Sequence, residues 1–227
     1  MGFVFLSVAI LFFGISASLA GVLLAAELDW LYFALMGMIA IALGTFGSAF
    51  NTYAGLYHAK DNEMLLSMPI PPVKLLIVRM TGVYAMSLLY SALVWLPALL
   101  QYLAQGAATL ASAGLGLLLT FVIAAFVSVL SCVLGWVVAL ISGKLKNKSI
   151  ITVLLTLVFL GAYYVIYFRM NELLEALLLN PGQTAQNIRT WIYPVYQMGR
   201  GAAGELLPML IFTAITAALC CLCVWVL

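Results

Sequence analysis

Long apolar stretches alternate with short polar segments along the whole chain. An α-helix needs about 20 apolar residues to cross the hydrocarbon core of a bilayer. Six stretches meet that length, at 3–26, 31–53, 80–104, 108–142, 150–168 and 206–227. No segment shows the apolar–polar alternation of a membrane-spanning strand. The pattern therefore predicts an all-α fold, a polytopic bundle of about six membrane helices in a single domain over 1–227.

The fourth stretch, 108–142, is too long for one straight crossing of the membrane. Gly114 and Gly116 interrupt its apolar pattern near the start. The sequence leaves three explanations open: the helix tilts, it extends past the membrane, or it breaks near the two glycines.

Composition supports a membrane protein over a soluble one. Hydrophobic residues make up 67% of the 227 residues and charged residues only 7%, with a mean hydropathy of +1.22. Soluble domains have about a quarter of their residues charged, and a soluble fold of this length cannot bury so much apolar surface. We therefore expect the lipid bilayer as a partner and no nucleic acid.

The basic residues predict the orientation. If the polar segment 57–79 is cytoplasmic, alternating crossings place 143–149 inside and both 27–30 and 169–205 outside. The inside set then holds six basic residues in short loops: Lys60, Lys74, Arg79, Lys144, Lys146 and Lys148. The outside set holds three: Arg169, Arg189 and Arg200. This asymmetry follows the positive-inside rule, so we expect a multi-pass protein of the inner (cytoplasmic) membrane with both termini in the cytoplasm.

Both ends of the chain lie almost inside predicted spans. No Lys or Arg precedes the first apolar run, which is also too long for a signal-peptide core, so we expect residues 1–26 to be a span. Cytoplasmic helix ends normally carry flanking charges. Their absence predicts that the chain is a fragment or one half of a longer protein.

The cysteines all fall in predicted spans. Cys132 lies in the fourth span, and Cys220, Cys221 and Cys223 lie in the sixth. A soft-metal site is one interpretation, but the spacing is not that of a zinc or haem motif and no histidine is near. We expect core packing, and no metal or other cofactor.

The segment between the second and third spans is the most informative one. It reads LYHAKDNEMLLSMPIPP over 56–72, with a polar turn from Lys60 to Glu63 followed by leucines and methionines. This pattern predicts a short helix at the membrane surface. Pro69 ends that helix, and Pro72 suits the first turn of the next one.

This run, followed by the basic Arg79, resembles the first cytoplasmic loop of bacterial ABC transporter permeases of the type-2 exporter family. In that family the loop carries a cytoplasmic coupling helix that docks on a separate ATPase. The resemblance implies a membrane-spanning permease subunit that couples this ATPase to substrate translocation through the loop 57–72. It also implies a second permease half or a homodimer. The residues expected to dock on the ATPase are Lys60, Asp61, Asn62, Glu63, Leu65 and Leu66.

Other features agree with the family and one departs from it. In the family the extracytoplasmic loop before the last span often forms short helices, and within 169–205 the stretch 171–179 has an amphipathic pattern. The cytoplasmic amphipathic helix with which such permeases usually begin is missing here. The chain contains no G-x-x-x-x-G-K-[ST] phosphate loop, so ATP hydrolysis is expected in the partner and no enzymatic activity in this chain.

Small residues form ridges on two of the predicted helices. Gly44, Ser48 and Gly55 share a face of the second span, and Ser128, Ser131, Gly135 and Ala139 share a face of the fourth. Such ridges let helices approach closely, either within one subunit or across a dimer. Three other polar residues, Asn51, Gln101 and Gln105, lie near span ends, where they suit interfacial anchoring better than a substrate path.

Three alternatives remain besides the permease. The span centres lack the ionisable residues of an ion-coupled secondary transporter. Gly44 to Ser48 is similar to a motif of intramembrane serine proteases, yet a serine nucleophile needs a base, and the single histidine, His58, lies in the loop. A non-transporting scaffold, assembly or immunity protein would have the same spans. The loop separates these readings, since only the permease requires it to bind an ATPase.

Overall fold

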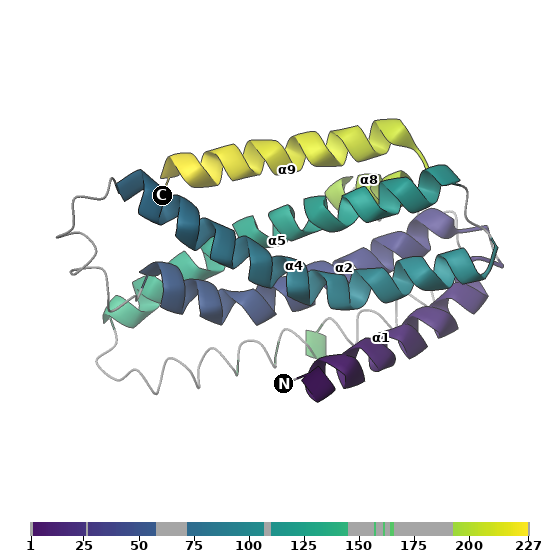
Figure 1. Cartoon of the computed structure of the whole chain (residues 1–227), viewed down its shortest axis with the longest axis horizontal. Helices are drawn as coiled ribbons and strands as arrows, with labels where there is room; N and C mark the ends of the chain where they lie inside the picture. The colour runs from purple at the N-terminus through teal and green to yellow at the C-terminus, as the bar shows by residue number, and fades with distance from the viewer. Residues whose placement is uncertain are drawn as a thin grey trace. The chain divides into compact units, whose positions relative to one another are not determined.

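The computed structural model describes residues 2–25, 27–57, 72–106, 110–144, 157, 161, 164, 165 and 193–226. The helices within these residues are α1 (Gly2–Leu23), α2 (Asp29–Thr52), the π-helix η1 (Tyr53–Tyr57), α4 (Pro72–Ala104), α5 (Leu110–Lys144), α8 (Tyr193–Ala202) and α9 (Leu206–Val226) (Figure 1). The described residues contain no strand. The predicted all-α fold is therefore confirmed.

The chain divides into two compact units. One comprises Met1–Gly135 with Pro194–Leu227, and the other comprises Trp136–Tyr193. The second unit contains the last turns of α5 and few other described residues. The contacts described below all lie within the first unit.

Four helices are long and apolar enough to cross a membrane: Asp29–Leu56, Lys74–Ala104, Ala111–Leu140 and Leu206–Trp225. A shorter apolar helix, Ser7–Leu23, lies within the first predicted span. The fold is thus a bundle of apolar helices of the kind that forms a multi-pass membrane protein. The predicted span 150–168 falls on residues that are outside the described part, apart from four positions.

Helix α5 runs without interruption through Gly114 and Gly116, so the structure excludes a break at these glycines. Its 35 residues correspond to about 52 Å of helix, more than the hydrocarbon core of about 30 Å, so tilting or extension past the membrane remains. Gly116 has a packing role instead. A Cβ there would overlap Leu99 of α4, and the Gly116 carbonyl accepts a 2.9 Å hydrogen bond from Trp95 Nε1.

Helix α4 begins at Pro72, as predicted, but it extends further toward the N-terminus than the predicted span 80–104. Lys74 and Arg79 are therefore helical residues near its start. At the other end, Gly106 adopts a φ of 73° and donates its N–H to the Leu103 carbonyl at 3.2 Å. A glycine in the left-handed region just after the last turn is a common way to end a helix.

Helix α2 lies at the centre of the first unit. Its residues from Leu31 to Met36 are at most 1% exposed, and it packs against both α4 and α1. A Cβ on Gly37 would overlap Met198 of α8, and one on Gly199 of α8 would overlap the Trp30 carbonyl. Many of the large apolar side chains on α1, α4, α5 and α9 are exposed, as expected for surfaces that face lipid.

Helix α1 is attached to the bundle through one buried tyrosine. The Tyr32 hydroxyl of α2 forms a 2.6 Å hydrogen bond with Ser16 Oγ of α1 and donates to the Ala98 carbonyl of α4 at 2.9 Å. Ser16 Oγ also donates to the Pro97 carbonyl at 3.5 Å. Tyr32 and Ser16 are fully buried, so this network joins three helices where no water is available.

We expect Tyr32→Phe to destabilise the protein by about 0.5–1.5 kcal/mol, because it leaves the Ala98 carbonyl and Ser16 without a buried partner. The measurement is the free energy of unfolding in mixed detergent micelles. Tyr84→Phe is the matched control, since the Tyr84 hydroxyl makes only a longer, exposed bond of 3.3 Å to the Phe121 carbonyl. Equal losses for the two variants would contradict a special role for Tyr32.

Candidate functional site

Three buried serines from three helices meet inside the bundle. Ser48 of α2 and Ser131 of α5 share a short hydrogen bond between their hydroxyls, and Ser87 of α4 donates to Ser48 Oγ at 3.3 Å. The three side chains have no exposed surface. We call Ser48, Ser87 and Ser131 the serine cluster. It lies in the middle of helices that are otherwise apolar, and it is the polar contact shared by α2, α4 and α5.

The local sequence explains how each hydroxyl can be buried. Residues four apart share one face of a helix, so each serine reaches the carbonyl one turn before it. Ser48 Oγ donates to the Gly44 carbonyl at 2.6 Å and Ser131 Oγ to the Val127 carbonyl at 2.8 Å. Ser131 Oγ also lies 3.4 Å from the Thr45 carbonyl. These bonds satisfy the hydroxyls within the apolar interior.

Glycines of α2 bring the helices close enough for these bonds. A Cβ on Gly44 would lie 2.9 Å from Val127 Cγ1 of α5, and a Cβ on Gly47 would lie 2.9 Å from the Tyr90 ring of α4. The two predicted ridges thus meet within one chain at Gly44, Ser48, Val127 and Ser131. Gly55, the third member of the α2 ridge, is exposed and has no neighbour within 4 Å.

The backbone of α2 changes its hydrogen-bond pattern just beyond the serine cluster. Thr52 is buried and donates to the Ser48 carbonyl at 2.9 Å, and the π-helix η1 begins at the next residue. π-helical turns occur frequently at functional sites. Here η1 ends at Tyr57, where the predicted coupling loop begins, and α4 starts at Pro72, where that loop ends.

The residues predicted to dock on an ATPase, Lys60, Asp61, Asn62, Glu63, Leu65 and Leu66, lie outside the described residues. His58 and the predicted helix 171–179 also lie outside them. What the structure does describe is the helix that enters this loop and the helix that leaves it. Both helices contribute to the serine cluster.

The polar residues near the span ends do not converge on a common site. Asn51 is exposed on α2, Gln101 is half-buried on α4, and Gln105 is exposed in the turn that follows. Their places at or near helix ends agree with interfacial anchoring. The hydrogen bonds of Ser48 are with hydroxyls and carbonyls, and none of these groups is the base that a serine nucleophile requires.

The opposite end of the bundle is covered by α8, which sequence reasoning did not predict. Gln197, Met198 and Gly199 are buried there, while Trp30 and Tyr196 pack edge to face with ring centroids 5.2 Å apart. Arg200 Nε donates to Glu205 Oε1 at 2.7 Å, which raises the pKa of Arg200. This exposed ion pair contributes little stability, so apolar packing holds α8 in place.

No protein-family model, curated protein or solved structure matches this chain. Its function is therefore argued from its own residues.

We expect Gly44→Leu to destabilise the protein by about 1–3 kcal/mol, because the added side chain overlaps Val127 and forces α2 away from α5. The measurement is again the free energy of unfolding in mixed micelles. Adding Val127→Ala should restore part of the loss by removing the overlapping methyl groups. Gly55→Leu is the matched control and should change little, since nothing lies within 4 Å of Gly55. A Gly44→Leu variant as stable as Gly55→Leu would contradict the close approach.

Proposed function

We propose that this chain is the membrane-spanning permease subunit of an ATP-driven ABC exporter, and that the loop 57–72 couples a separate cytoplasmic ATPase to substrate translocation. The observation that carries the proposal is the position of this loop between η1 and α4. The two helices that flank it, α2 and α4, pack against each other and share the buried Ser87–Ser48 hydrogen bond. A force on the loop would therefore act on a packed pair of helices and not on a free linker.

The serine cluster supports transmission of such a force. When the ATPase subunits close, they would push on the loop, and α2 and α4 would move as one body because Gly47 and Tyr90 pack at close range. Ser131 links the same body to α5. Packed interiors switch between discrete arrangements and do not deform continuously. η1 is the place in α2 where the backbone can absorb the change of direction.

The lining of the bundle favours an apolar or amphipathic cargo. The central turns of α2, α4, α5 and α9 contain no Asp, Glu, Lys, Arg or His, and ionisable residues normally mark ion and proton routes through a membrane. This disfavours an ion-coupled transporter. The orientation proposed from the basic residues places the loop 57–72 and both termini in the cytoplasm, with the chain in the inner membrane and paired with a second half or a second copy.

The test is co-purification with the ABC ATPases encoded beside this protein. We expect one of them to bind the wild type, and Asp61→Ala/Glu63→Ala/Leu65→Ala to lose it while insertion into the membrane stays unchanged. Glu27→Ala is the matched control, because Glu27 is exposed in the turn proposed to face the other side of the membrane, and it should bind like the wild type.

Two outcomes would overturn the proposal. One is that no ATPase binds the wild type, and the other is that the loop variant binds as well as the wild type. Either result would favour a scaffold or a transporter of another class.

A further inference from the structure

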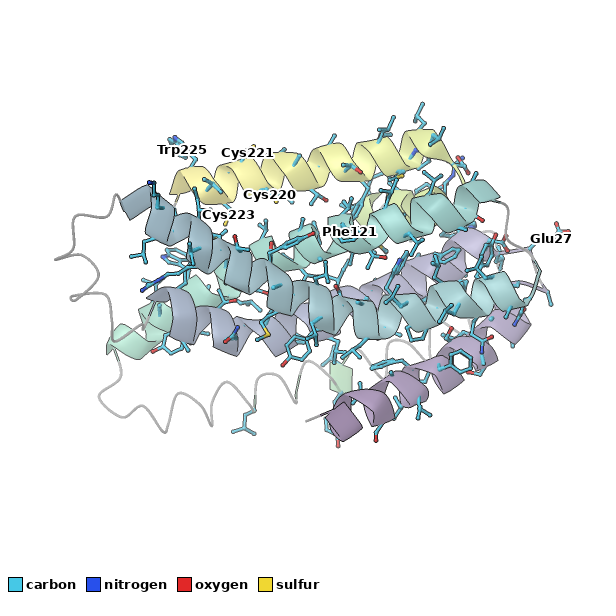
Figure 2. The ribbon with its side chains drawn as sticks, viewed as in Figure 1. Glu27, Phe121, Cys220, Cys221, Cys223 and Trp225 are labelled. Atoms are coloured by element: carbon cyan, nitrogen blue, oxygen red, sulfur yellow. The ribbon has the colours of Figure 1, made fainter. Side chains whose placement is uncertain are left out.

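Sulfur atoms from three helices gather in a buried cluster away from the serine cluster. Cys132 of α5 and Cys223 of α9 form the buried part together with Val83 and Val129, and Met80 of α4 packs against them. Figure 2 shows Cys220 and Cys223 on the edge of α9 that is turned toward the other helices and Cys221 on the opposite edge. Core packing is thus confirmed for Cys132 and Cys223. It is wrong for Cys221, which is exposed.

The geometry of three of these sulfurs is close to that of a ligand set. Cys132 Sγ lies 3.9 Å from Met80 Sδ, and the Cys132 and Cys223 thiols are hydrogen-bonded to each other. Two sulfur ligands placed 120° apart at about 2.3 Å from an ion are themselves about 4 Å apart. An ion could therefore replace the thiol proton between Cys132 and Met80 with little movement of either helix. We call Met80, Cys132 and Cys223 the sulfur cluster.

The donor set selects a soft ion. No group of three His, Cys, Asp or Glu side chains in the described part of the chain is placed to hold a metal, so a third ligand has to be the Met80 thioether. Thioethers and thiolates bind Cu(I), whereas magnesium and calcium require oxygen. Structural zinc sites need four nitrogen, sulfur or oxygen ligands, which the sulfur cluster does not supply.

We propose that Met80, Cys132 and Cys223 form an intramembrane binding site for one Cu(I) ion. Binding releases the two thiol protons and changes no oxidation state, which leaves a three-coordinate complex with a net charge of −1. Arg79 precedes Met80 in α4, so its positive charge lies at nearly the same depth and partly offsets this charge. Met80 lies eight residues after the start of α4, or about 12 Å along the helix, which keeps the site near the bundle end from which an ion would enter.

The test is titration of the detergent-solubilised protein with Cu(I) under anaerobic, reducing conditions against a chromophoric Cu(I) chelator. We expect the wild type to hold one Cu(I) per chain. Cys132→Ser and Cys223→Ser should each lose it, and Met80→Leu should weaken it by at least about tenfold. Cys221→Ser is the matched control, since it removes an exposed thiol of the same helix, and should bind like the wild type. X-ray absorption of the loaded protein should show sulfur neighbours only.

The proposal is overturned if the wild type holds no Cu(I), if Cys221→Ser loses as much as Cys223→Ser, or if the absorption spectrum shows nitrogen or oxygen neighbours. Met80→Leu keeps the test sharp should a cysteine variant fold poorly, because Met and Leu have similar volumes and exchange at low cost. Unchanged Cu(I) binding in a well-folded Met80→Leu protein also overturns the three-sulfur site. This site does not involve the ATPase, so its failure would leave the permease proposal standing, and the reverse also holds.

Discussion

The close approach of α2 to its neighbours is the constraint on which the rest of the structure depends. Lipid tails are as apolar as the side chains of these helices, so burial of apolar surface gives little drive for one helix to leave lipid and join another. Tight van der Waals contact and hydrogen bonds have to hold the bundle instead. Gly44 and Gly47 allow the contact, and Ser48 adds hydroxyl bonds to α4 and α5 at the same level.

The two ends of α2 connect this central contact to different parts of the molecule. At one end Tyr32 holds α1 and α4, Asp29 accepts a 3.1 Å hydrogen bond from Tyr102, and α8 packs over Trp30 and Gly37. At the other end α2 continues into η1 and toward the loop 57–72. A motion that starts at the loop would therefore reach most of the first unit through a single helix, which is the mechanical requirement of the proposed permease.

Most of the membrane helices could be predicted from the sequence because apolar length alone identifies a span. The errors have physical causes. The predicted start of α4 came too late, because Lys74 and Arg79 read as loop residues although long basic side chains extend toward the membrane surface from within a helix. Gly114 and Gly116 suggested a break, but a glycine in a helix packed against Leu99 costs little when the neighbour fills the space above it.

The candidate site was only half predictable. Gly44, Ser48 and Ser131 could be found because they recur at helical spacing among apolar residues. Ser87 has a similar partner at Ser91, but a short pair of serines gives no sign of which helix it faces, and that depends on the tertiary packing. The same is true of α8, whose burial follows from the fit of Gly199 and Gly201 against Trp30 and Met209, and of Met80, whose role depends on cysteines far away in the sequence.

The measurement that tests the central contact most directly is a double-mutant cycle on Ser48→Ala and Ser131→Ala, read as free energies of unfolding in mixed micelles. The structure predicts that the two substitutions are not additive, with a coupling energy of about 0.5–1.5 kcal/mol in favour of the pair, because removing either hydroxyl already breaks the bond. Additive losses, with no coupling beyond experimental error, would show that Ser48 and Ser131 do not hold α2 against α5 and would contradict the account of the bundle given above.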